Sequence, residues 1–227
     1  MQLYHFWSDA ASQRVHLALG AKGILAADAQ AIALAYDDDE RFFELGVART
    51  VPVLVLDSGT VLTDSVAILR RIDELVPGEP QLAGSVVASG AWQALLGWRS
   101  SVDAVLARLY APARLAYRDL ADDLQARAAY SAEMQHTFGL SVESLANDRY
   151  DGYGQLDRLT NLRGLARDLA KRRFYHGTLS IGDCLLAADL APLQVLDGIS
   201  LPIDLMYYVR RVFEACGVDL EAGLAAT

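Results

Sequence analysis

Two short polar motifs in the sequence could bind a small charged molecule. The first, Asp64-Ser65, follows an apolar hairpin pattern and precedes a helical one, so a carboxylate and a hydroxyl lie beside the free N–H groups of a helix start. Such a corner can bind a zwitterion, because the helix end accepts its carboxylate and Asp64 accepts its ammonium group. An ordinary helix cap is the competing interpretation of the same two residues.

The second motif, Thr50-Val51-Pro52, precedes the same hairpin. A cis Val51–Pro52 bond would turn the main chain of Val51 outward and provide an edge for an extended peptide ligand. A proline at the edge of a sheet would produce the same sequence without any binding function.

A third motif, Ser180-Ile181-Gly182-Asp183, has the form of a capping box and predicts the start of a buried helix. We interpret its role as structural. Asp189 lies in the apolar stretch that follows, so we expect its carboxylate to need a hydrogen-bond partner.

Other kinds of site have no support in the sequence. The phosphate-binding patterns G-x-x-x-x-G-K-[ST] and G-x-G-x-x-G are absent, and so is the G-x-S-x-G elbow of serine hydrolases. The four histidines form no metal-binding pair on a helix, so no metal site is expected. Two cysteines, Cys184 and Cys216, are too few for a disulfide framework.

The composition narrows the class of protein further. The 227 residues are 53% hydrophobic and 22% charged, which excludes intrinsic disorder. No apolar run approaches the ~18–20 residues of a membrane span. The formal net charge of −9 argues against general nucleic-acid binding, which needs a basic face. We therefore expect a cytoplasmic protein that binds neither membranes nor nucleic acid.

The elements that must position these motifs fall into two parts. Up to residue 78 the patterns alternate as strand, helix, strand, helix, hairpin and helix, with strands at 2–7 and 29–35 and the hairpin at 53–62. A mixed sheet with packed helices fits this order. Pro77-Gly78-Glu79-Pro80 marks a linker, and the chain from residue 85 onward is helical nearly throughout. We expect an α/β domain at 1–78 and an all-α helical bundle at 85–227.

Taken in order, the motifs resemble those of a cytosolic glutathione S-transferase of the bacterial, serine-type kind. They span nearly the whole chain: Leu3-Tyr4, Ser12-Gln13-Arg14-Val15, Val51-Pro52-Val53-Leu54, Asp64-Ser65-Val66-Ala67-Ile68 and Ser180-Ile181-Gly182-Asp183. The resemblance implies a thioredoxin-like N-terminal domain, which binds glutathione, and an all-α C-terminal domain. It also implies a homodimer and a role in detoxification.

The resemblance assigns glutathione contacts to five residues. The main chain of Val51 would pair with the cysteinyl part of glutathione, with Pro52 as the cis-proline. Asp64 and Ser65 would hold the γ-glutamyl end, although Asp64 stands where Glu or Gln is commoner and is one methylene shorter. Arg49 is the best available cation for the glycyl carboxylate.

The group that stabilises the glutathione thiolate is less clearly marked. A free thiol titrates at about 8.5, so glutathione needs a group that lowers this pKa if its thiol is to ionise near neutral pH. A hydroxyl or N–H at the start of the first helix would stabilise the thiolate by hydrogen bonding, aided by the helix dipole. Serine-type members place this hydroxyl five residues before the arginine that corresponds to Arg14. That position is Asp9 here, and a one-residue difference in the loop would bring Ser8 into it. Ser12 and then Tyr4 follow as candidates, and a main-chain N–H near residues 10–11 is the alternative to all three.

The electrophile pocket would lie between that loop and the first long helix of the bundle. Trp7 and Tyr110 are the residues assigned to it, and Tyr110 is favoured because Ala111-Pro112 should bend the helix there. Further candidates are Trp98, Leu106 and Tyr117, although aromatic residues at helical spacing are usually core.

We expect a glutathione transferase that adds glutathione to a small hydrophobic electrophile, with glutathione as co-substrate and no metal. The loop before the first helix carries no cysteine, which disfavours membership of the disulfide-forming and disulfide-reducing branches of the family. Two alternatives stay open: a non-catalytic glutathione-binding or scaffold protein, and a glutathione-dependent isomerase or dehalogenase.

Overall fold

The computed structural model describes residues 1–225, so positions 226–227 of the expected helical bundle lie outside the described residues. Its N-terminal part is built on a four-stranded mixed sheet in the order β2-β1-β3-β4. β1 (Gln2–His5) pairs in parallel with β2 (Gln30–Ala33) and antiparallel with β3 (Val53–Val55). β4 (Val61–Leu62) closes the hairpin, in which Gly59 has a φ of +83 that favours glycine.

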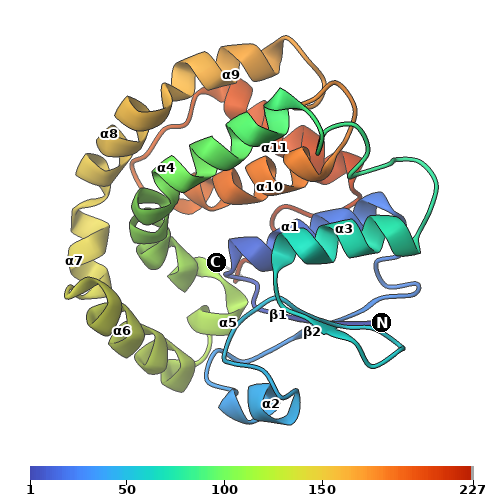
Figure 1. Cartoon of the computed structure of the whole chain (residues 1–227). Helices are drawn as coiled ribbons and strands as arrows, with labels where there is room; N and C mark the ends of the chain where they lie inside the picture. Colours follow the sequence, from blue (N-terminus) through green and yellow to red (C-terminus); the bar gives the residue numbers. More distant parts are fainter. Residues whose placement is uncertain (226–227) are drawn as a thin grey trace.

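The two faces of this sheet are covered by different helices. Leu3 and Leu54, which are register partners, pack with α1 (Ala10–Ala21) and α3 (Ser65–Leu75). On the other face, Tyr4 and Val53 pack with Phe42 of α2 (Asp39–Glu44). Figure 1 shows α1 and α3 on one side of the sheet and α2 on the opposite side. This alternation is what a sheet with two covered faces requires.

The rest of the described chain is helical. Its α-helices are α4 (Gly90–Ala113), α5 (Arg118–Ala121), α6 (Leu124–Phe138), α7 (Val142–Asn147), α8 (Arg149–Thr160), α9 (Leu162–Ala170), α10 (Ile181–Leu190) and α11 (Ile203–Ala215). Two short 3-10 segments, Arg114–Ala116 and Ala191–Val195, follow α4 and α10. A thioredoxin-like N-terminal part and a helical C-terminal part are therefore confirmed.

The nearly continuous helical chain expected from residue 85 onward is interrupted around residues 122 and 139 for local reasons. Asp123 caps α6 by accepting hydrogen bonds from the N–H groups of residues 125 and 126. Gly139 ends α6 in the left-handed conformation, with a φ of +68, and Ser141 then caps α7. A left-handed residue followed by a new N-cap stops one helix and begins the next.

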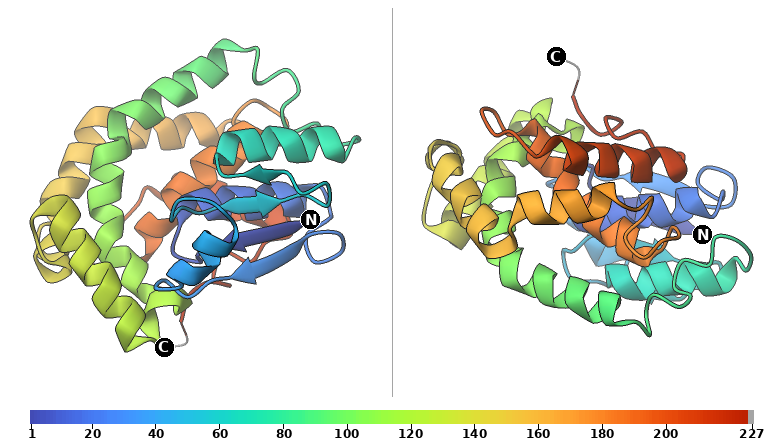
Figure 2. Two further views of the ribbon diagram at one scale, coloured as in Figure 1. Left: turned by 60° about the horizontal axis from the view of Figure 1, so that its bottom comes forward. Right: turned by 90° about the horizontal axis from the view of Figure 1, so that it is seen from above.

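The helices are arranged around α10. Figure 1 shows α6, α7, α8 and α9 following one another around the outer side of α4. α10 packs against α1, α4 and α11, so it joins the helical part to the sheet part. Both views of Figure 2 place α6–α8 on one side of the molecule and the sheet on the other. Among the described residues, no helix is long and apolar enough to cross a membrane.

Two buried histidines, His5 of β1 and His16 of α1, lie side by side. The rings of His5 and His16 are 4.3 Å apart between centroids, and Trp7 stacks on His16 at 5.3 Å. His5 Nδ1 and His16 Nε2 are buried and have no hydrogen-bond partner among the described residues. Burial lowers the pKa of His5 to about 3, with a further contribution from His16, and lowers the pKa of His16 to about 4. Both rings are therefore neutral in the folded protein near neutral pH.

This pair is expected to make the protein acid-labile. Unfolded histidines titrate near 6.5, so each neutral ring contributes stability above that pH and loses it as the pH falls toward 4, at about 1.4 kcal/mol per pH unit and ring. We expect the free energy of unfolding, measured with urea at pH 7 and pH 5, to fall much less in the His5→Gln/His16→Gln variant than in the wild type. The exposed His136→Gln variant is the control. Equal losses in the wild type and the double variant would show that the pair does not titrate this way.

Candidate functional site

A cavity of about 310 Å³ lies where the start of α1 faces α4 and α6. Ser8 and the first residues of α1 form one wall of this cavity, while Leu106, Met134 and Phe138 supply an apolar wall from α4 and α6. The cavity therefore has a polar end at a helix N-terminus and an apolar side. It lies where the electrophile pocket is expected from the sequence, between the first loop and the first long helix of the bundle.

Local sequence positions the polar end. Asp9 caps α1, because its Oδ2 accepts a hydrogen bond from the N–H of Ser12 at 2.6 Å and its carbonyl accepts one from Gln13 at 3.1 Å. The N–H groups of the first helical residues, Ala10 and Ala11, have no acceptor among the described residues, and both residues line the cavity. Two main-chain donors and the positive end of the helix dipole therefore face the space.

Ser8 lines the cavity, but its hydroxyl proton is directed elsewhere. Ser8 Oγ donates to Asp119 Oδ2 at 2.6 Å, and the Ser8 N–H donates to Asp119 Oδ1 at 3.1 Å. Arg114 Nε donates to Ser8 Oγ at 3.3 Å. Burial raises the pKa of Asp119, and the hydrogen bonds from Ser8 and the charge of Arg114 oppose that rise. The first sequence candidate is therefore the centre of a buried hydrogen-bond network.

The other two candidate hydroxyls are not brought to this cavity. Ser12 is completely buried and its Oγ has no partner among the described residues. Tyr4 packs on the α2 side of the sheet, where its hydroxyl donates to Gln2 Oε1 at 3.0 Å. Neither residue is among those that line the cavity.

The residues assigned to glutathione lie at element ends: Val51 and Pro52 directly precede β3, and Asp64 and Ser65 stand at the start of α3. The Val51–Pro52 peptide bond is cis. Asp64 is exposed and caps α3, with its Oδ1 accepting from the N–H of Ala67 at 2.7 Å. Ser65 is buried, and its Oγ accepts a hydrogen bond from Arg14 Nη1 at 3.0 Å. Arg14 also lines the cavity, so it connects Ser65 to that space.

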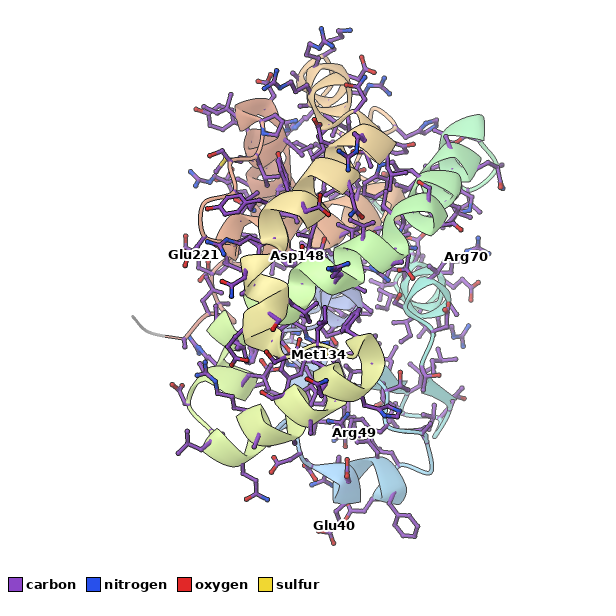
Figure 3. All side chains as sticks on the ribbon, turned by 90° about the vertical axis from the view of Figure 1, so that its left-hand side faces the viewer. Glu40, Arg49, Arg70, Met134, Asp148 and Glu221 are labelled. Carbon is purple, nitrogen blue, oxygen red and sulfur yellow. The ribbon has the colours of Figure 1, made fainter. Side chains whose placement is uncertain are left out.

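Arg49 is engaged by protein groups. Its guanidinium pairs with Asp39 of α2 and, through Nη1, with Glu133 Oε2 of α6 at 2.8 Å. It also donates to the carbonyl of Tyr36 and lies over the Tyr36 ring at 4.4 Å. Figure 3 shows Arg49 between the helix of Glu40 and the helix of Met134. Its interactions therefore join the α2 region to α6.

Asp189 has the partners that its burial requires. Its Oδ1 accepts from Arg14 Nε at 3.1 Å and Nη2 at 2.5 Å, and its Oδ2 accepts from Arg99 Nε at 2.6 Å. The expectation that this carboxylate needs a partner is confirmed. All three side chains line the cavity, and they join α1, α4 and α10.

The two aromatic residues assigned to the electrophile pocket lie beside different cavities. Tyr110 lines the cavity, and its hydroxyl is buried without a partner among residues 1–225; burial raises its pKa well above the usual value. Trp7 lies instead beside a different cavity, of about 500 Å³, together with His16. The chain near Gly223 covers Trp7, because a Cβ at Gly223 would lie 2.9 Å from it. The position of Trp7 thus differs from the expected one.

Three further residues of this region were not anticipated from the sequence: Arg114, Asp119 and Glu133. In a helical pattern, charged residues usually indicate a solvated face, and nothing local distinguishes these three. Their positions depend on contacts between segments 84 to 111 residues apart, such as Ser8–Asp119 and Arg49–Glu133. A buried carboxylate beside Ser8 is visible only in the folded chain.

The sequence matches two protein-family models. Residues 10–75 match "Glutathione S-transferase, N-terminal domain", and residues 94–225, more than half of the chain, match "Glutaredoxin 2, C terminal domain". A comparison with curated protein sequences finds no match.

Several solved structures share the fold. Glutaredoxin 2 of Salmonella typhimurium in complex with glutathione has a TM-score of 0.79 and 21% identity, covering 96% of this chain and 95% of that chain. A glutathione S-transferase of Ceriporiopsis subvermispora, also with glutathione, has a TM-score of 0.71 and 16% identity, with 95% and 96% covered. Maleylacetoacetate isomerase of Methylobacterium extorquens, with malonate and glutathione, has a TM-score of 0.56 and 20% identity, with 96% and 94% covered. These likenesses establish the architecture of the chain.

Proposed function

Because the chain belongs to the glutathione S-transferase family, we propose that it is a glutathione transferase that adds the glutathione thiolate to a small hydrophobic electrophile. The observation that carries the proposal is the 310 Å³ cavity, which combines the free N–H groups of a helix start with an apolar wall. A thiolate needs the first feature and a hydrophobic electrophile needs the second. Homodimerisation and a role in detoxification stay predictions.

In this proposal glutathione lies between the start of α3 and the start of α1, which Ser65 and Arg14 connect. Ser65 and Asp64 hold the γ-glutamyl end, and the main chain of Val51 pairs with the cysteinyl part. The sulfur then lies at the start of α1, next to Ala10 and Ala11. The electrophile enters from the apolar side of the cavity.

Reduction of disulfides by a cysteine of the protein itself has less support. Thiol–disulfide exchange begins with attack by a thiolate. The chain has two cysteines, Cys184 and Cys216, and both are buried in the helical part, outside the lining of the cavity. A hydrogen bond with the Cys216 sulfur, together with burial, raises the pKa of the Cys184 thiol well above its usual value, which opposes the formation of a thiolate. The reactive thiol is therefore assigned to glutathione.

One observation favours a second candidate function, a glutathione-binding protein without catalysis. Ser8 donates its hydroxyl proton to Asp119 and so offers no proton to a sulfur. If the start of α1 alone lowered the thiol pKa too little, glutathione would bind as the unreactive thiol.

Binding and ionisation can be measured separately. We expect titration calorimetry to detect binding of both glutathione and S-methylglutathione, and ultraviolet absorbance to detect a bound thiolate near neutral pH. Turnover is expected with an aromatic halide. Binding without a thiolate or turnover would support the non-catalytic function, and no binding of either compound would contradict both candidates.

Ser65→Ala is expected to weaken S-methylglutathione binding by about tenfold, because a hydrogen bond to a charged ligand group would be lost. The matched control is Ser58→Ala, in the exposed turn of the hairpin. Equal affinities of the two variants would remove Ser65 from the binding site.

A further inference from the structure

The hydrogen bonds of Ser8 leave its oxygen as an acceptor toward the cavity. Its single proton is donated to Asp119 at 2.6 Å, and one lone pair of the same oxygen accepts from Arg114 Nε at 3.3 Å. An oxygen in this arrangement presents electron density, not a proton, to any neighbouring sulfur. A thiolate in the cavity therefore needs a donor other than the Ser8 hydroxyl.

Arg114 is placed to be that donor. It lines the cavity, and Nε is the one nitrogen of its guanidinium with an acceptor among the described residues. The other two arginines of the cavity, Arg14 and Arg99, are paired with Asp189. Arg114 has no carboxylate within ion-pair distance among residues 1–225, so the N–H groups of its Nη1 and Nη2 are free to bind an anion.

The surroundings of Arg114 hold the cation in place. Its Cζ lies 5.3 Å from the centre of the Tyr130 ring and 5.8 Å from that of Tyr36. Burial lowers the pKa of the guanidinium, but the oxygens of Tyr130, Asp9, Tyr36 and Asp119 together raise it above its usual value. A buried guanidinium that stays charged without a carboxylate partner is costly, and a bound anion would relieve that cost.

We propose that Arg114 stabilises the thiolate of bound glutathione, and that Asp119 and Ser8 position Arg114 for this. The inference rests on the proposed function and names the group that ionises the thiol. Asp119 fixes the Ser8 oxygen, the Ser8 oxygen accepts from Nε, and Arg114 thereby lines the same cavity as Ala10 and Ala11 at the start of α1. The guanidinium of Arg114 supplies the positive charge, and the N–H groups of Ala10 and Ala11 donate the other hydrogen bonds to the sulfur.

Other charged and titratable groups face this region from each neighbouring element. They include Asp9 before α1, Tyr36 between β2 and α2, Asp103 on α4, Tyr117 and Asp119 at α5, and Tyr130 and Glu133 on α6. Glu133 accepts hydrogen bonds from Tyr36 and Arg49, so its charge is compensated locally. Arg114 is the unpaired cation of the set among the described residues.

The test is the pH titration of bound glutathione by thiolate absorbance in the full chain. Arg114→Gln is expected to raise the pKa of the bound thiol by at least one unit, which is about tenfold less thiolate below that pKa. S-methylglutathione, which has no thiol to ionise, is expected to bind that variant within about threefold of the wild type. Arg114→Lys keeps the charge and is expected to retain most of the thiolate, and it serves as the second variant if Arg114→Gln does not fold.

The matched control is Arg108→Gln, six residues earlier in the chain on α4, where Arg108 pairs with Asp148 and does not line the cavity. It is expected to leave the thiol pKa unchanged. An unchanged thiol pKa in Arg114→Gln would overturn the inference, as would a large loss of S-methylglutathione affinity without a pKa change, which would make Arg114 a carboxylate-binding residue. Loss of the thiolate in Ser8→Ala, with the thiolate retained in Arg114→Gln, would also overturn it. Absence of glutathione binding in the wild type would instead contradict the proposed function itself.

Discussion

Replacement of Asp183 by alanine is expected to lower the free energy of unfolding by about 4 kcal/mol, the largest effect of any substitution that we predict. Asp183 is completely buried at the start of α10. Its carboxylate accepts hydrogen bonds from the N–H of Tyr175 at 2.7 Å, from Tyr208 Oη at 2.8 Å, and from both the N–H and the Oγ of Ser180 at 3.0 and 2.8 Å.

Alanine would leave all four donors without this acceptor. Burial raises the pKa of Asp183 more than its hydrogen bonds lower it, so keeping the buried carboxylate ionised reduces the free energy of unfolding. That cost offsets part of the loss, which is why the expected effect is smaller than the sum of four charged hydrogen bonds. Urea unfolding at pH 7 measures the effect.

Tyr208→Phe is the matched control, because it removes one donor of the same network and keeps the ring. It is expected to cost about 1–2 kcal/mol. A loss below about 1 kcal/mol in Asp183→Ala would show that the network contributes little to the stability of the folded chain.

Replacement of Asp189 by alanine is expected to cost about 3 kcal/mol. The change removes the only carboxylate that pairs, within the described residues, with Arg14 of α1 and Arg99 of α4. Two guanidinium groups would then share one site without a counter-charge. Both groups line the cavity, so water can solvate them in part, and the expected loss lies at the low end for a broken buried ion pair.

The control for this prediction keeps the charges balanced. Arg99→Met removes one cation and leaves Asp189 paired with Arg14, so it is expected to cost less than Asp189→Ala in the same urea experiment. The double variant Asp189→Ala/Arg99→Met is expected to recover part of the loss. Equal losses in Asp189→Ala and Arg99→Met would mean that the unpaired charges do not determine the effect.

The ion pair and the cavity share one location, between the sheet and the helical part. α10 carries Asp189 at its C-terminal end and Asp183 at its N-terminal end, and it packs against α1. The start of α1 faces the cavity. The helix that stabilises the bundle therefore also positions the helix that carries the candidate site.

Local sequence was sufficient for much of the architecture. Each cap or turn is formed within a few residues: Asp9 with Ser12, Asp64 with Ala67, Ser180 with Asp183, and the 53–62 hairpin with its glycine. Because these interactions span few residues, their residue types predict them directly. The order of elements, and with it the mixed sheet followed by helices, follows from these signals.

The roles of single side chains at the site could not be predicted in the same way. Ser8 is the first hydroxyl that the sequence offers to a thiolate, yet its proton is donated to Asp119, 111 residues away. The sequence assigns both Trp7 and Tyr110 to the electrophile pocket and favours Tyr110, but only the folded chain shows that Tyr110 alone of the two lines the 310 Å³ cavity.

The sequence by itself therefore determined the elements, their order and the motifs at their ends, because those depend on neighbouring residues. Only the tertiary structure decided which polar groups have partners and which face the cavity. Arg114 and Asp119 meet Ser8 because the segment after α4 packs against the start of α1, and no local pattern encodes that approach. Hydrogen-bond directions and unpaired charges arise from packing between distant segments, and these are the features on which the chemistry of the site depends.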